Sequence, residues 1–237
     1  MPTFTSFSDL LPDPINKINN AGAADASGNA GPGFAKIKFT SDNTTQVSRT
    51  ISGRGVTASP SYHSWSFDIS YNPMTRDEFD PIGTFLDGRR GRLNPFYVIL
   101  PQHALPKSAA FASNTITAAS TTLAGSPTIL IGGVNSGEPS PGDFFTITDN
   151  TDVNHKKAYK VLRVETASTY QVGTTPPGAT QRRIWTQPPI SRTVTSGATL
   201  NFVNPKFRVI QKGDTLEYDL DTDNLYQFSL SLEEILP

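Results

Sequence analysis

The stretch Phe79–Leu100, FDPIGTFLDGRRGRLNPFYVIL, interrupts a chain that otherwise alternates like a β-sheet protein. Just before it, in SWSFDISY, the apolar residues from Trp65 to Tyr71 recur at every second position, which is the period of a strand with one buried face. Inside the stretch, Phe79, Ile82 and Leu86 recur at helical spacing, and FYVIL follows as a compact apolar run. The sequence therefore predicts a strand, a short amphipathic helix on the sheet, and a buried strand.

The predicted helix lies near residues 75–87. Thr75 and Glu78 have the spacing of a capping box, and Asp80 followed by Pro81 offers a second start. Because proline in a helix interior costs about 3 kcal/mol, we expect a first turn at 75–80 and a kink or restart at 80–81. Gly88 is the expected left-handed C-terminal stop.

Composition favours an all-β class. The chain has 237 residues with 18 glycines and 19 prolines, and only 17% of its residues are charged, against about 25% in an average protein. The formal charge of −1 gives no overall attraction to nucleic acid or to an anionic membrane, and no apolar run is long enough to span one. The absence of cysteine excludes disulfides and thiolate metal sites.

The order of the patterned segments predicts a discontinuous domain with an insertion. We expect an N-terminal arm and linker at 1–33, a β-sandwich with the helix at 34–105 and 199–237, and an inserted OB-like or small β-barrel at 106–198. The insertion is rich in threonine and serine and contains short strands separated by Gly-containing or Pro-containing breaks. The arm is too apolar for a free tail, so we expect it to lie on its own domain or on a neighbouring subunit.

No catalytic, cofactor or metal site is expected. His63, His103 and His155 stand far apart, and neither HExxH nor GxSxG occurs. Asp77, Glu78, Asp80 and Asp87 are carboxylates that could serve a glycosidase, but helix capping already explains Glu78 and Asp80. The pattern favours a scaffold or a binding module over an enzyme, and a hydrolase assembled from scattered residues ranks last.

The order of these pieces resembles the distal tail, or baseplate ring, proteins of bacteriophages. The residues that carry the resemblance are SWSFDISYNPMT, the helix ending in FLDGRRGRLNPFYVIL, the return through LNFVNPKFRVI, and the terminal strand YQFSLSLEEIL. The GDFFTI and AYKVLRVE segments are similar to the small OB-like barrel that some members carry.

The resemblance implies a non-enzymatic virion protein that is made in the host cytoplasm and located in the tail. It would form a homo-hexameric ring around the tail axis and connect the tail tube protein to the hub or tail-tip proteins, without reading nucleic acid and without entering a membrane. Phe4 and Phe7 of the arm, with Arg89, Arg90 and Arg92 after the helix, are then candidates for the subunit interface. The arginines would pair with a neighbour's acidic segment around Asp219, Asp221 and Asp223, although helix-end electrostatics also explains them.

Two alternatives remain open at this point. The barrel could be a carbohydrate-binding module that grips a host glycan through Tyr159, Tyr170 or Trp185. The chain could also be another tail tube or tail-completion protein.

Overall fold

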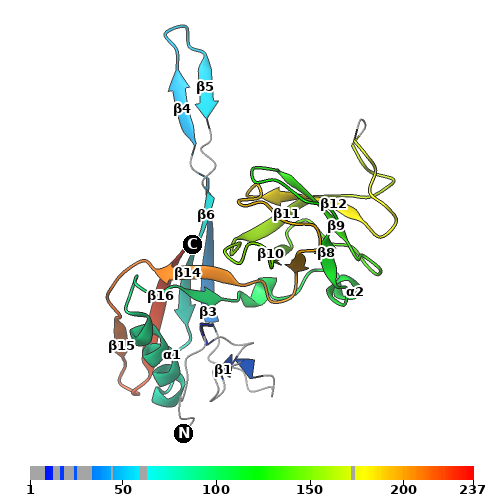
Figure 1. Ribbon diagram of the computed structural model, residues 1–237. Coiled ribbons are helices and arrows are strands. Elements are labelled where there is room, and N and C mark those ends of the chain that lie inside the picture. The colour runs from blue at the N-terminus through cyan, green and yellow to red at the C-terminus, as the bar shows by residue number, and fades with distance from the viewer. Residues whose placement is uncertain are drawn as a thin grey trace. The chain divides into compact units, whose positions relative to one another are not determined.

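The computed structural model describes residues 9–12, 17–18, 24–25, 34–43, 45–58, 63–171 and 174–237. The chain divides into two compact units (Figure 1). Unit 1 comprises Met1–Val98 and Arg208–Ile235, and unit 2 comprises Ile99–Phe207 with the last two residues. The predicted all-β class with a small barrel module is confirmed.

Unit 1 is built on a six-stranded sheet with the order β3, β6, β16, β14, β7, in which β15 also pairs with β16. The strands are β3 (Phe34–Asn43), β6 (His63–Tyr71), β7 (Phe96–Val98), β14 (Phe207–Gln211), β15 (Tyr218–Leu220) and β16 (Tyr226–Glu234). A separate pair joins β1 (Lys17–Ile18) to β2 (Ala24–Asp25). The two strands with the clearest alternation, β6 and β16, are hydrogen-bonded neighbours, with Leu230 opposite Ile69.

One face of this sheet is apolar and covered, as the alternation predicts. Trp65, Phe67 and Ile69 of β6 are at most 1% exposed, whereas the residues between them are half-buried. Helix α1 (Arg76–Arg89) lies on the covered face, where the Phe79 ring stacks on Tyr226 with ring centroids 4.6 Å apart. The described part of this unit therefore has α1 on its sheet where a sandwich would have a second sheet.

Helix α1 differs from the prediction at two points. It runs without interruption through Pro81, so the expected kink or restart at 80–81 is wrong. Pro81 removes only the bond to the carbonyl of Asp77, an exposed residue whose carbonyl can bond to water instead. The helix also ends later than expected, because Arg90 rather than Gly88 takes the left-handed C-cap conformation, at φ 55°. The Glu78 carboxylate accepts from the Thr75 backbone N–H at 2.9 Å, so this half of the capping box forms.

A two-stranded hairpin continues the β3–β6 pair. It consists of β4 (Gln46–Arg49) and β5 (Gly55–Ala58), which pair with each other in antiparallel register. Every residue from 45 to 57 is exposed, including Val47 at 64%, Ile51 at 110% and Val56 at 52%. The hairpin thus has no hydrophobic core of its own.

Unit 2 is a closed six-stranded barrel in which every strand pair is antiparallel. The strands are β8 (Ile116–Ala118), β9 (Thr128–Gly132), β10 (Phe144–Thr148), β11 (Ala158–Glu165), β12 (Arg182–Gln187) and β13 (Thr199–Asn201). Their order around the barrel is β10, β11, β12, β9, β8, β13. Of the two expected forms, the small closed barrel is present, and it differs from the five-stranded, partly open OB-fold.

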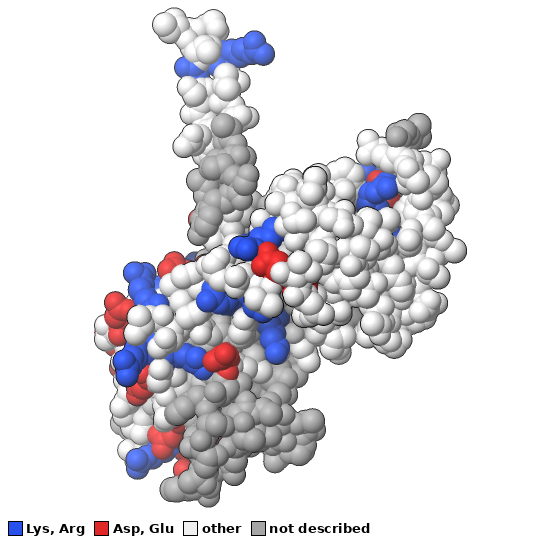
Figure 2. Space-filling view, in the orientation of Figure 1, with Lys and Arg blue, Asp and Glu red and all other residues white. Residues whose placement is uncertain are grey.

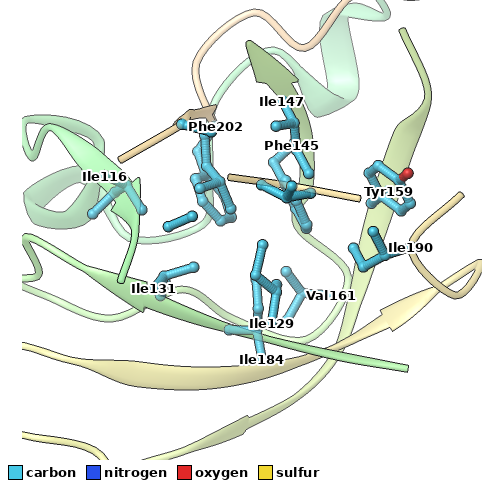
Figure 3. Packing of buried hydrophobic residues seen from close by; sticks show 14 of the residues in the cluster. Ile116, Ile129, Ile131, Phe145, Ile147, Tyr159, Val161, Ile184, Ile190 and Phe202 are labelled. Carbon is cyan, nitrogen blue, oxygen red and sulfur yellow. The ribbon is translucent and has the colours of Figure 1, made fainter. Parts of the chain in front are cut away.

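Apolar side chains from all six strands fill the barrel. Phe145 and Tyr159, both 0% exposed, stack with ring centroids 5.5 Å apart, and Phe202 lies 4.9 Å from Phe145 (Figure 3). Isoleucines of several strands, among them Ile129 and Ile184, complete the core. A 3₁₀ turn at Pro101–His103 and the short helix α2 (Ala109–Ala112) precede β8.

Unit 2 begins at Ile99 and ends its main segment at Phe207, whereas the expected limits were 106 and 198. The reason at the C-terminal end is that β13 pairs with both β8 and β10 and so closes the barrel. Among the helices that the structure describes, none is long and apolar enough to cross a membrane.

Candidate functional site

The three arginines predicted for a subunit interface lie in different environments at the end of α1. Arg89 is the least exposed: its side chain is 12% exposed, its Nη1 donates to Asp9 Oδ1 at 2.9 Å, and its guanidinium lies 4.7 Å from the centroid of the Phe85 ring. Arg89 therefore binds the N-terminal segment of its own chain to the helix.

That segment adds to the sheet at β7. The Leu11 N–H donates to the Tyr97 carbonyl at 2.8 Å, and the Tyr97 N–H donates to the Asp9 carbonyl, in a parallel pairing. Leu10 and Leu11 are 7% and 0% exposed. Residues 9–12 of the arm thus lie on their own domain, whereas Phe4 and Phe7 lie outside the described residues.

Arg90 and Arg92 flank a tight turn at Gly91. Gly91 has φ 62°, and a Cβ there would come within 2.9 Å of the Asp214 Cα, so the close approach of the two segments requires glycine. Asp214 Oδ1 accepts from the Arg92 backbone N–H at 3.1 Å, and the exposed Arg92 guanidinium lies 3.8 Å from Glu233. In the described part of the chain, no ion pair joins these arginines to Asp219, Asp221 or Asp223.

The hairpin β4–β5 is a second basic surface, which the sequence interpretation missed. Between residues 45 and 58 it contains Arg49 and Arg54 but no carboxylate, and the space-filling view shows blue atoms and no red ones on it (Figure 2). The sequence did contain a sign of this exposed hairpin. Residues 41 to 62 are mainly polar or small, and Val47 and Val56 are not part of an apolar face there. From residue 45 to residue 57 the hairpin is exposed throughout.

An acidic counterpart lies at β15. Tyr218 and Leu220 of this strand are 47% and 52% exposed, and Asp219 stands between them. In the turn that follows, Asp221 Oδ1 accepts from the backbone N–H groups of Asp223 and Leu225, so Asp221 shapes the turn. Asp219 and Asp223 carry exposed negative charge beside exposed apolar side chains.

The barrel contains a buried polar chain that the sequence did not reveal. His155, which is 1% exposed, bonds through Nε2 to the Tyr159 hydroxyl at 2.7 Å, and that hydroxyl bonds to Ser191 Oγ at 2.8 Å. Burial lowers the pKa of His155 to about 4, although Asp152 and Asp149 act in the opposite direction. The imidazole is therefore neutral near pH 7, and the chain connects the start of β11 to residue 191.

Two other carboxylates of the barrel are buried and have polar partners. Asp149 accepts from the backbone N–H and the hydroxyl of Thr195, at 2.7 and 2.8 Å. These hydrogen bonds outweigh the effect of burial and lower the pKa of Asp149 to about 2. Glu165, at 0% exposed, contacts Arg163 at 3.2 Å and Arg183 at 3.4 Å on the outer face of the barrel. The partners of each carboxylate explain its burial, so no catalytic role is needed to account for it.

The three aromatic residues proposed for glycan binding differ in exposure. Tyr159 is fully buried in the barrel core, so its predicted stacking role is wrong. Trp185 is half-buried, and its Nε1 donates to Glu165 at 3.3 Å, while Tyr170 is 37% exposed. A role of Trp185 and Tyr170 in glycan binding stays a prediction.

The comparisons with known proteins add no assignment. No protein-family model matches the sequence, and no curated protein matches it either. Among the described residues, no group of three or more histidines and carboxylates has a geometry suited to a metal ion.

Proposed function

We propose that this chain is a structural component of a bacteriophage tail, a distal tail or baseplate ring protein. Copies of the chain would assemble around the tail axis as a homo-hexameric ring, as the resemblance implies, and connect the tail tube to the hub or tail tip. The proposal rests on the sequence resemblance and on one structural observation, the exposed hairpin β4–β5.

The hairpin supports an assembly role because nothing in the described chain covers it. A two-stranded hairpin is marginally stable in water by itself, and this one leaves Val47, Ile51 and Val56 in solvent. Docking on a second copy would bury these side chains. At about 25 cal/mol per Å², their burial would contribute a few kcal/mol to each contact.

The acidic surface at β15 is the complementary site on the neighbouring copy. On this surface, exposed Tyr218 and Leu220 accompany the negative charges of Asp219 and Asp223. The hairpin likewise presents exposed valines together with Arg49 and Arg54. Two different surfaces that meet in this way form a head-to-tail contact, which closes into a ring when the rotation between copies permits.

In this proposal the positive charges of the interface lie on the hairpin and not at the end of the helix. Arg89 already pairs with Asp9 of its own chain, and an ion pair with a neighbouring copy would require that contact to break. Arg49 and Arg54 are exposed and have no such partner among the described residues. Arg90 and Arg92 remain candidates for the subunit interface.

A charge-swap experiment tests the proposal. We expect the full chain to form a closed oligomer in size-exclusion chromatography with light scattering, with rings in negative-stain images. Arg49→Glu with Arg54→Glu should shift the protein to monomer, because like charges then face each other across the contact. Adding Asp219→Lys and Asp223→Lys in the same chain should restore the ring.

The matched control is Lys206→Glu, a charge reversal at an exposed residue of unit 2, which should leave the ring intact. A chain that stays monomeric at high concentration, both alone and with tail tube and hub proteins, would contradict the tail-ring function. A ring that survives the arginine reversals would contradict the hairpin contact alone.

A further inference from the structure

Unit 2 contains a cavity of about 270 Å³ at the start of β10, and neither the barrel core nor the proposed ring contact uses it. Its walls come from three segments: residues 102–107 after the 3₁₀ turn, the turn at 142–144, and Lys160 on β11. The residues that matter chemically are Gln102, His103, Lys107, Asp143 and Lys160.

The charges at the cavity are mainly positive. Lys107 is exposed, and Lys160 is half-buried, with its ammonium 5.9 Å from the centroid of the Phe144 ring and without an ion pair in the described part of the chain. Asp143 supplies the opposite charge but is only 4% exposed. Its Oδ1 accepts from the Lys107 backbone N–H at 3.0 Å and its Oδ2 from the Ser140 backbone N–H at 2.7 Å, so both oxygens are occupied by the wall.

The position of Lys107 is fixed by the chain around it. Its ammonium donates to the Pro141 carbonyl, and Gly142 leaves the space that this approach needs. Gly142 has φ 96°, and a Cβ at that position would lie 3.1 Å from the Lys107 Nζ. A side chain here would be strained and would also displace the ammonium.

The pKa of His103 depends on the charges around the cavity. Burial is the main cause that lowers its pKa, the charges of Lys160 and Lys107 lower it further, and Asp143 acts in the opposite direction. These four groups are the titratable residues of the cavity. An anion bound among them would counter the two ammonium charges and favour the protonated imidazole.

We propose that this cavity binds a small oxyanion, a carboxylate or phosphate group borne by a compact ligand such as an acidic sugar. Lys160 and Lys107 supply the charge, His103 and Gln102 supply further donors, and backbone N–H groups of the wall already bond to both carboxylate oxygens of Asp143. The volume is below the roughly 300–1,000 Å³ of sites for drug-sized ligands, which limits the ligand to about one such unit. The site does not depend on the tail function.

The experiment follows the His103 imidazole by NMR in the full-length protein at constant ionic strength. The probes are inorganic phosphate, acetate, glucuronate, glucose 6-phosphate and uncharged glucose. We expect the anions to shift the His103 signals along a saturating curve and to raise its pKa, whereas glucose leaves them unchanged. Tighter binding of glucuronate or glucose 6-phosphate, by tenfold or more over acetate and phosphate, would identify the anion of a sugar, and equal binding would identify a free anion.

Variants decide whether the response belongs to this cavity. Lys160→Met should weaken binding at least tenfold, and Lys160→Arg should retain most of it. Lys107→Met is the second test, and Lys206→Met, at an exposed lysine outside the cavity, is the matched control and should bind normally. The proposal is overturned by a linear response without saturation, or by equal responses in Lys160→Met and Lys206→Met, because either marks general charge screening.

Discussion

The two units bury their strands in different ways. In unit 1 the alternating strands β6 and β16 lie in an open sheet, which covers one face with α1 and continues into the exposed hairpin β4–β5. In unit 2 six short strands close on themselves, so that Phe145, Tyr159 and the isoleucines fill an interior with no free sheet edge.

The open sheet of unit 1 is the part of the molecule where an interaction surface is expected. A closed barrel pairs the backbone groups of its strands internally, whereas an open sheet presents unpaired groups at its edges. Unit 1 therefore has the elements that gain most from contact with another chain, and unit 2 is the more self-sufficient part. The two tryptophans, Trp65 on β6 and Trp185 on β12, provide one spectroscopic reporter for each unit.

The largest expected effect separates the stabilities of the two units. Phe145→Ala removes a fully buried ring that contacts Tyr159 and Phe202, and we expect a loss of about 3–5 kcal/mol in the unfolding free energy of the barrel. Urea denaturation followed by Trp185 fluorescence in a Trp65→Phe background should show it. Trp65 fluorescence in a Trp185→Phe background should show an almost unchanged transition, and equal shifts of both reporters would mean that the units unfold together.

A pH dependence specific to the barrel is the next largest effect. The folded-state pKa of His155 is about 4, below its usual value near 6.5, so between these values the unfolded chain binds a proton that the folded chain does not. The stabilisation is complete above pH 6.5 and is lost progressively as the pH falls towards 4. Between pH 7 and pH 4.5 we expect a loss of about 2–3 kcal/mol, measured by urea denaturation at each pH.

His155→Gln is the control for this effect, because glutamine does not titrate and can still bond to the Tyr159 hydroxyl. The variant should lose less stability than the wild type over the same pH interval. An identical pH dependence of the two proteins would assign the loss to other groups.

The smallest expected effect concerns the hairpin. Val47→Ser and Val56→Ser change exposed residues, so each should alter the unfolding free energy of the monomer by less than about 0.5 kcal/mol. Ile69→Ala, in the buried face of β6 and 1% exposed, should cost about 2–5 kcal/mol in the same Trp65 assay. A large loss from either valine change would show that the hairpin is covered within its own chain, against the proposed contact.

Local patterns in the sequence predicted the elements of unit 1 well. The period of two in SWSFDISY and YQFSLSLEE gave β6 and β16, and the helical spacing of Phe79, Ile82, Phe85 and Leu86 gave the buried face of α1. The same reasoning failed at Pro81 and Gly88. There, packing of the helix on the sheet outweighed the local cost of proline, and Arg90 took the left-handed position.

The candidate sites were harder to predict than the elements. Arg89 binds Asp9, which lies 80 residues away in the sequence. The cluster of arginines around Arg89 gave no sign of this pairing. The basic cavity assembles Lys107 and Lys160 from segments with no common motif. Tyr159 looked like a stacking residue because its neighbours in the sequence do not reveal which face of β11 points into the barrel.

The class of the protein, the positions of its best-patterned strands and the existence of its helix could be predicted from the sequence, because they depend on side-chain periodicity over a few residues. The tertiary structure decided which strands pair, that β13 closes the barrel between β8 and β10, and which charged groups are buried. Those outcomes depend on contacts between residues far apart in the chain, such as Asp149 with Thr195, whose energies no local pattern records.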